Sequence, residues 1–166
     1  MLQIRDARPE DTSLILHFIC ALADYERLRH EVVATEANLT ETLFGPRPYA
    51  EVLIAEWDGQ PVGFALFFHT YSTFLAQPGI HLEDLFVETS HRGQGIGHAL
   101  LARLAAITVE RRCGRLEWAV LDWNHDAIRF YTRLGAVPMD EWTTFRLTGD
   151  DLLRLVTQQP QLHTAT

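Results

Sequence analysis

The chain has 166 residues, of which 47% are hydrophobic and 22% are charged, a length and composition that predict one globular domain with an ordinary core. Its net charge of −8 argues against a general nucleic-acid binder and is compatible with a cationic small-molecule substrate. All 14 basic residues are arginines, which excludes a phosphate-binding loop that uses lysine and any mechanism in which a protein lysine forms a Schiff base.

The N-terminal half of the chain predicts a strand, two helices and a hairpin. A short strand is expected over residues 2–7, and Pro9 with two acidic residues after it marks the start of a helix that runs to about residue 28. Thr35 opens a second helix, which the breaker Gly45-Pro46 ends. The hairpin is expected at residues 51–57 and 62–68, on either side of the turn DGQP.

The C-terminal half alternates strands and helices. After a strand over residues 80–87 and a glycine-rich loop, apolar residues at helical spacing predict a helix to about residue 112. The further elements are expected as strand 115–123, helix 124–136 with Gly135 as its C-terminal cap, strand 142–147 and helix 150–156. The order predicts a mixed α/β fold with helices packed on one sheet, in a single domain over residues 1–158 with a polar tail over 159–166.

The glycine-rich loop, RGQGIG at residues 92–97, connects a predicted strand to a predicted helix. The first N–H groups of a helix have no partner within the helix, and its dipole places partial positive charge there. Glycines let a bulky anion approach these groups, so the unit predicts a phosphate or pyrophosphate site; the alternative is a tight turn without a ligand. The dinucleotide fingerprint fails, because its third glycine position would be His98 or Leu100.

Two stretches resemble the GNAT superfamily of N-acetyltransferases. The first is Arg92-x-x-Gly95-x-Gly97, which is similar to the loop that binds the pyrophosphate of acetyl-CoA in that family. The second is WNHDAIRFYTRLGA at residues 123–136, similar to the family's strand, asparagine, Phe-Tyr pair and closing glycine. The resemblance implies a GNAT-type acyl-CoA N-acyltransferase fold, with a mixed central sheet flanked by helices, and acetyl-CoA as the acyl donor.

The order of further short motifs, from about residue 3 to 155, resembles the spermidine/spermine and thialysine acetyltransferases. By this resemblance, the amine substrate would contact Tyr25, Glu26, Glu83, Glu117, Trp118 and Ala119. The acyl donor would contact the backbone of Leu85, Phe86 and Val87, the loop residues Arg92, Gly93, Gln94, Gly95, Ile96, Gly97 and His98, and then Asn124, Ala127 and Tyr131. From the residues alone, Asn124 also fits a plain helix N-cap and Tyr131 a core position.

Acetyl transfer requires a neutral amine, whose ordinary pKa is about 10.4, so a proton acceptor is needed. Glu83 and Asp84 are adjacent strand positions and are expected to point to opposite faces, so that only one of them faces the site. We expect Glu83 to face it, either as the base, directly or through water, or as an anchor for the ammonium group. The resemblance makes Tyr131 the general acid that assists departure of the thiolate.

The sequence therefore predicts an enzyme that acetylates a primary amine of a small cationic substrate: a polyamine, a diamine or a lysine-like amino acid. A protein or peptide N-acetyltransferase and a non-catalytic acyl-CoA-binding protein are the alternatives. No metal site is expected, because the histidines lack metal-ligand spacing. No apolar run is long enough to span a membrane and no signal peptide is recognisable, so we expect a cytoplasmic protein, and the resemblance suggests a homodimer.

Overall fold

The computed structural model describes residues 1–157, so the tail predicted over residues 159–166 lies outside the described residues. The chain divides into two compact units, Met1–Ala119 and a second that begins at Val120. Each unit is described by itself below. Among the described residues, no helix is both long and apolar enough to cross a membrane.

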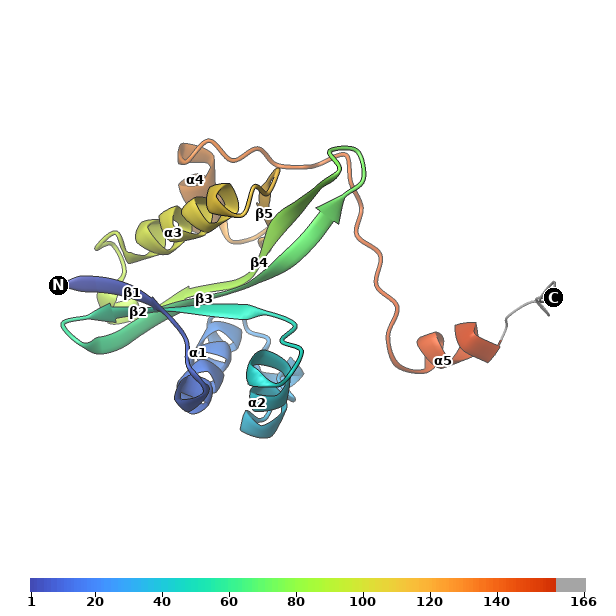
Figure 1. Ribbon diagram of the computed structural model, residues 1–166, viewed down its shortest axis with the longest axis horizontal. Helices are drawn as coiled ribbons and strands as arrows, with labels where there is room; N and C mark the ends of the chain where they lie inside the picture. The colour runs from blue at the N-terminus through green and yellow to red at the C-terminus, as the bar shows by residue number, and fades with distance from the viewer. Residues whose placement is uncertain (158–166) are drawn as a thin grey trace. The chain divides into compact units, whose positions relative to one another are not determined.

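The first unit is built on a five-stranded sheet in the order β1-β2-β3-β4-β5 (Figure 1). The first four strands are antiparallel and β5 runs parallel to β4, which confirms the mixed sheet expected from the sequence. The strands β3 and β4 are longer than predicted and β5 is shorter. Their bounds are β1 Leu2–Asp6, β2 Glu51–Trp57, β3 Gln60–Ser72, β4 Gln77–Val87 and β5 Leu116–Trp118.

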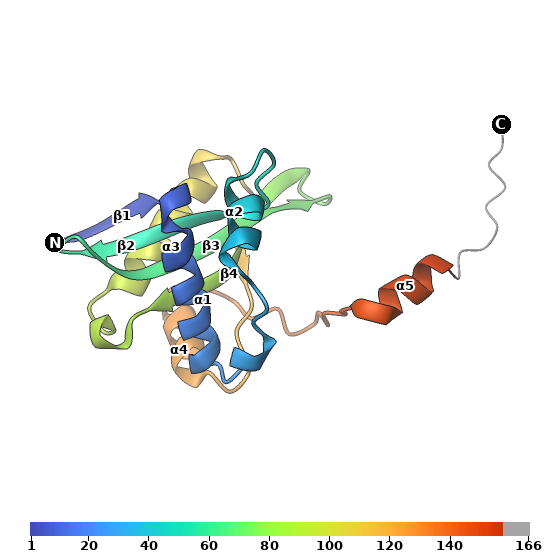
Figure 2. The ribbon, with the colours of Figure 1, turned by 90° about the horizontal axis from the view of Figure 1, so that it is seen from below.

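Helices cover both faces of this sheet. The helices α1 (Thr12–Tyr25) and α2 (Glu36–Phe44) lie on one face and α3 (Ile96–Glu110) on the other, as Figures 1 and 2 show together. Three short 3-10 turns complete the unit, at Pro9–Asp11, Arg29–Glu31 and Thr89–His91. This arrangement confirms the predicted helices, because each apolar stripe finds a sheet face on which to be buried.

The core under α1 and α2 is aromatic. Phe18 of α1 stacks on Phe64 of β3, with ring centroids 5.4 Å apart, and Phe86 of β4 packs at 6.0 Å from Phe18. The three rings are buried, and Ile15 and Ile54 beside them are fully buried. Burial of large apolar side chains is the main stabilising contribution to folding, so this cluster fixes α1 against the C-terminal end of β4.

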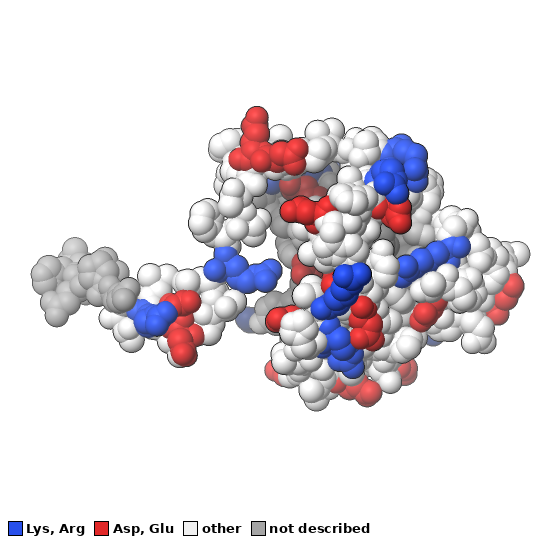
Figure 3. All heavy atoms as spheres, turned by 180° about the vertical axis from the view of Figure 1, so that it is seen from behind, with Lys and Arg blue, Asp and Glu red and all other residues white. Residues whose placement is uncertain are grey.

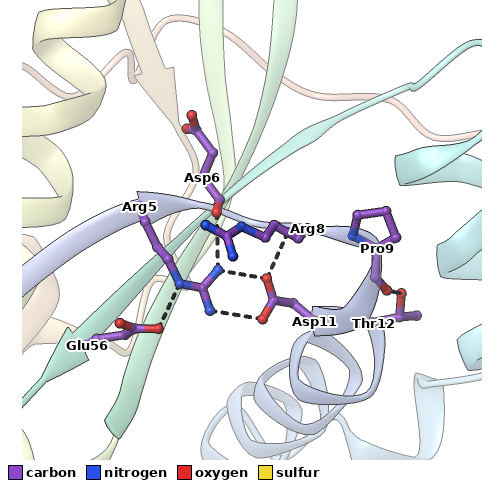
Figure 4. Close-up of polar contacts among 7 residues, drawn as sticks. All are labelled: Arg5, Asp6, Arg8, Pro9, Asp11, Thr12 and Glu56. Carbon is purple, nitrogen blue, oxygen red and sulfur yellow. Dashed lines mark hydrogen bonds and ion pairs between the residues drawn. The ribbon is translucent and has the colours of Figure 1, made fainter. Parts of the chain in front are cut away.

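A second anchor of α1 is electrostatic and lies at its N-terminal end (Figure 4). The guanidinium group of Arg5 on β1 donates two parallel hydrogen bonds to Asp11, at 2.7 and 2.9 Å, and its Nε donates to Glu56 of β2 at 2.7 Å. The backbone N–H of Arg8 donates to the same Asp11 carboxylate. These side chains are only 14 to 21% exposed, so two part-buried carboxylates share one arginine.

The second unit contains the helices α4 (His125–Arg133) and α5 (Gly149–Thr157). Gly135 follows α4 with φ of +89°, and the N–H groups of Gly135 and Ala136 bond back to the last turn, which confirms the predicted cap. The strand predicted over residues 142–147 is wrong: this segment is irregular, and Phe145 is 93% exposed. Its alternating sequence is not enough, because a strand needs a partner for its backbone hydrogen bonds and the described residues provide none.

Candidate active site

The loop between β4 and α3 takes its shape from two glycines. Gly93 and Gly95 have φ of +77° and +81°, a left-handed conformation that side chains with a Cβ disfavour. A Cβ added at either position would meet no heavy atom within 4 Å, so both glycines border open space. Gly97 has ordinary backbone geometry and lies under β4, with Val87 at 4.0 Å from the position of an added Cβ.

The loop presents backbone donors to this open space. Gly95 caps α3, and the N–H groups of Ile96, Gly97 and His98 make no hydrogen bond within residues 1–157, whereas that of Ala99 bonds to Gly95. Unpaired N–H groups at a helix start, beside glycines without contacts, suit a phosphate-bearing group. The residues present therefore fit the pyrophosphate of an acyl-CoA.

Arg92 makes a contact that the sequence did not indicate. Its Nε donates to the carbonyl oxygen of Val87 at 2.9 Å, and its guanidinium carbon lies 4.5 Å from the ring centre of Tyr25 and 5.6 Å from that of Phe86. A guanidinium group over an aromatic face is an attractive cation–π pair. Arg92 thus joins the loop to the C-terminal end of α1, where Tyr25 and Glu26 lie.

Strand β4 loses its partner on one side as it nears the loop. It pairs with β5 only from Ile80 to Leu82, opposite Leu116 to Trp118. Beyond that point, residues 83–87 have β3 on one side and no strand on the other within the described residues. The backbone of Leu85, Phe86 and Val87 therefore borders a gap in the sheet, which is the position that the resemblance gives to groups holding the acyl donor.

A β-bulge lies at the same point and corrects one prediction. Asp84 is opposite Leu66 of β3, but the next pair is Leu82 opposite Phe67, so Glu83 is an extra residue in β4. Past the bulge, His81 is opposite Phe68, and its ring lies 5.1 Å from the ring of Phe68.

Leu66 and Phe68 are two positions apart in β3, so they share one face of the sheet, the face covered by α1 and α2. Their partners Asp84 and His81 consequently share that face as well, and Glu83 reaches His81 with 3.5 Å between Oε2 and Nε2. The expectation that Glu83 and Asp84 point to opposite faces is therefore wrong. The bulge breaks the alternation on which that expectation rested.

Three carboxylates are gathered here, and they differ in environment. The side chain of Glu83 is 55% exposed and lies beside His81. Asp84 is half-buried, and this partial burial raises its pKa to about 6, with further contributions from the negative charges of Glu83 and Glu26. Burial also raises the pKa of Glu26, at the C-terminal end of α1. We call Glu26, Glu83 and Asp84 the β4 carboxylate cluster.

The remaining predicted substrate residues of the first unit lie on and after β5. Glu117 is opposite His81 and Trp118 is opposite Leu82, and Ala119 follows β5 as an exposed residue. Glu117 also forms an ion pair with Arg115 at 2.5 Å. An arginine therefore partly neutralises its charge, whereas no arginine of the described residues forms an ion pair with the β4 carboxylate cluster.

The predicted residues Asn124, Ala127 and Tyr131 belong to the second unit. The side-chain oxygen of Asn124 accepts a hydrogen bond from the N–H of Ala127 at 3.3 Å, so the N-cap interpretation is confirmed. Tyr131 lies in the last turns of α4, with its ring 5.4 Å from that of Phe130. Their predicted contacts with an acyl donor stay predictions.

The sequence favours Glu83 over Asp84 as the residue that faces the site, but the structure places both on the face covered by α1. A bulge depends on how two strands pair, and β4 alone does not reveal it. The signal present in the sequence was the pair of adjacent acidic residues in an otherwise apolar strand. Charged residues are rarely buried without a partner, so such a pair indicates a functional position at both residues.

Comparison with known proteins agrees with this geometry. The model of the acetyltransferase (GNAT) family matches residues 17–136. The chain belongs to the GNAT acetyltransferase family. The resemblance found in the loop and in the WN…FY…G stretch is thereby confirmed, as is the prediction of an N-acetyltransferase with a GNAT fold. The family uses acetyl-CoA as its acyl donor.

Individual relatives support the same assignment. The chain is 37% identical to a thialysine N-epsilon-acetyltransferase of Bos taurus, over 92% of this chain and 95% of the relative. It is 34% identical to L-ornithine N5-acetyltransferase NATA1 of Arabidopsis thaliana, over 90% of this chain and 86% of the relative. A solved integron cassette protein from the mobile metagenome of V. cholerae superposes with a TM-score of 0.79 at 27% identity, covering 95% and 98% of the two chains.

Proposed function

We propose that the chain transfers the acetyl group of acetyl-CoA to a primary amine of a small cationic substrate: a polyamine, a diamine or a lysine-like amino acid such as thialysine or ornithine. The transfer is direct, from thioester to amine, and needs no covalent enzyme intermediate. The names of the relatives, which act on thialysine and ornithine, support this class of acceptor.

One observation carries the proposal. The glycine loop, the unpaired stretch of β4 and the β4 carboxylate cluster all meet around residues 83–95 of the first unit. The loop suits a pyrophosphate and the cluster suits a cation, because it holds three carboxylates and none of them forms an ion pair with an arginine among the described residues. A thioester bound along β4 would therefore lie next to a bound ammonium group.

On the face drawn in Figure 3, arginine and acidic side chains are interspersed, and no single sign dominates. The net charge of −8 therefore adds a general attraction for cations, while the choice of substrate rests on the groups near β4.

Tyr131 is proposed as the general acid that gives its proton to the departing thiolate. An ordinary tyrosine pKa of about 10 and a thiol pKa near 8.5 leave a gap of about 1.5 units, small enough for a hydrogen bond to assist departure. Replacing Tyr131 by Phe is expected to slow turnover and to leave acetyl-CoA affinity within about twofold. Tyr49→Phe, at an exposed tyrosine of the first unit, is the matched control.

The test of the function is an acceptor panel with acetyl-CoA, which includes spermidine, putrescine, thialysine, ornithine and a basic peptide. Turnover on the small amines supports the proposal, and turnover on the peptide alone, or binding of coenzyme A without any turnover, contradicts it. Gly95→Val is expected to weaken binding of coenzyme A at least tenfold by calorimetry. Gly59→Val is its control, because Gly59 has φ of +79° and equally open surroundings in the β2–β3 turn.

The homodimer and the cytoplasmic location expected from the sequence are kept as proposals. Light scattering of the purified chain tests the dimer, and cell fractionation tests the location.

A further inference from the structure

We propose that Asp84, and not Glu83, takes the proton from the substrate ammonium group, while Glu83 and Glu26 hold its positive charge. The inference rests on the proposed function, because it assumes a cationic amine at the β4 carboxylate cluster. It concerns the division of roles among these three carboxylates.

The first argument is the position of Asp84. The bulge at Glu83 places Asp84 opposite Leu66, on the face covered by α1, at the point where β4 has lost its β5 partner. Asp84 is followed directly by Leu85, whose backbone is in the predicted path of the thioester. A proton acceptor must lie within hydrogen-bond reach of the attacking nitrogen, directly or through one water, and Asp84 is the carboxylate adjacent to that path.

The second argument is what surrounds the carboxyl group. Asp84 accepts no hydrogen bond and meets no cation within residues 1–157, and the groups that act on its charge are the negative Glu83 and Glu26. Glu83, by contrast, is more than half exposed and lies beside His81. A carboxylate that is more than half exposed can hold a cation at the rim of the site, and a half-buried carboxylate beside two negative charges is more easily protonated.

The third argument is basicity. Burial, and then the two neighbouring carboxylates, raise the pKa of Asp84 from 3.8 to about 6. An acceptor with this pKa is about two powers of ten more basic than an ordinary aspartate, and it is still ionised at neutral pH. The titratable and charged groups around Asp84 come from three elements. Strand β4 provides His81 and Glu83, and the end of α1 provides Tyr25 and Glu26. The loop provides Arg92, which lies over Tyr25.

The proposed step is a proton transfer from the substrate ammonium group to Asp84. One N–H bond of the ammonium group breaks, its electron pair stays on nitrogen, and an O–H bond forms on the Asp84 carboxylate. The neutral amine then has the lone pair that attacks the thioester. Asp84 returns its proton to water after the product has left.

The experiment is the pH profile of kcat/KM for a diamine acceptor, measured on the full chain with the variants Asp84→Asn and Glu83→Gln. Wild type is expected to lose activity below an apparent pKa near 6. We call this fall in activity the acidic limb of the pH profile, the limb near 6. Asp84→Asn is expected to lower kcat at pH 7 about 100-fold and to abolish the acidic limb. Its rate should instead rise with pH toward the pKa of the free amine, near 10, because only the amine deprotonated in solution reacts. Glu83→Gln should raise the KM for the amine about tenfold and keep the limb near 6.

Coenzyme A affinity, measured by calorimetry, should be unchanged in both variants, which shows that they are folded and separates this test from the proposed function. If wild type itself turns over no amine, the proposed function fails and the inference fails with it. If wild type is active and Asp84→Asn keeps both its limb near 6 and a kcat within threefold of wild type, only the assignment of Asp84 is overturned. Loss of the limb in Glu83→Gln and not in Asp84→Asn also overturns it and returns the role to Glu83.

Discussion

Two groups of carboxylates in the first unit have opposite arrangements. At the N-terminal end of α1, Asp11 and Glu56 share the guanidinium group of Arg5, with three hydrogen bonds of 2.7 to 2.9 Å (Figure 4). At the C-terminal end of α1, Glu26 lies near Glu83 and Asp84 of β4, and the described residues provide no arginine between them.

The consequences for the pKa values are opposite as well. Hydrogen bonds from Arg5 lower the pKa of Asp11, so that carboxylate stays charged over a wide pH range. Burial and like charge raise the pKa of Asp84 to about 6. A carboxylate that the protein neutralises contributes to the fold, and one that the protein leaves unpaired is available to a cationic ligand.

The largest effect is expected from removing the shared arginine. Arg5→Met should lower the free energy of unfolding at pH 7 by about 3 kcal/mol, because two part-buried carboxylates are left without a partner. Urea unfolding of the variant and wild type measures it. Arg103→Met, at an exposed arginine of α3 paired with Glu110, is the control and should cost less than about 1 kcal/mol. Equal losses would contradict the view that the Arg5 group is an anchor.

In the β4 carboxylate cluster, removing a charge is expected to increase the free energy of unfolding. The pKa of Asp84 is about 6 in the fold and 3.8 when unfolded, so the folded chain binds its proton more tightly and stability falls as pH rises from about 4 to 6. Asp84→Asn removes this cost and should raise stability at pH 8 by about 2 kcal/mol, allowing for partial solvent exposure.

Thermal unfolding at a series of pH values checks this prediction. The gain should be full above pH 6 and should vanish below about pH 4, where wild-type Asp84 is protonated in both states. A variant less stable than wild type at pH 8 would show that Asp84 has a stabilising partner after all.

A smaller loss is expected from Asp11→Asn, because Arg5 keeps Glu56. The pKa of Asp11 is lowered in the fold, so its contribution is present above the unfolded value of about 3.8 and is lost as pH falls through the folded value. At pH 7 the variant should be about 1.5 kcal/mol less stable than wild type. Urea unfolding at pH 7 and pH 3 tests it: the difference should shrink at pH 3, and a constant difference would argue for lost packing and not lost charge.

The smallest effect is expected on the KM for the amine, from neutralising Glu26, the member of the β4 carboxylate cluster at the end of α1. Glu26→Gln should raise the KM for a diamine about threefold and leave the affinity for coenzyme A unchanged, because one of several carboxylates is removed. Steady-state kinetics at low salt and at about 0.3 M salt measure the KM, and the difference in KM between variant and wild type should be smaller at the higher salt concentration. Glu41→Gln, in α2, is the control with the same change of charge.

Much of the fold was predictable from the sequence, and so was the local shape of the loop at the candidate site. The apolar spacing of α1 and α3, the hairpin around the DGQP turn and the glycine loop all depend on residues close to one another in the chain, and each was confirmed. The failures were non-local. Residues 142–147 have the pattern of a strand without a partner, and the faces of Glu83 and Asp84 depend on pairing with Leu66 and Phe67 of β3.

The sequence by itself predicted the shape of the glycine loop, because glycine conformation and helix-start geometry are local properties of a few residues, and its motifs carried the resemblance to the GNAT family and to its acyl donor. Only the tertiary structure decided which carboxylates share a face, how exposed each of them is, and that Arg92 lies over Tyr25. The physical reason is that burial and strand register depend on neighbours brought from distant parts of the chain, and these neighbours set the pKa and the role of each charge.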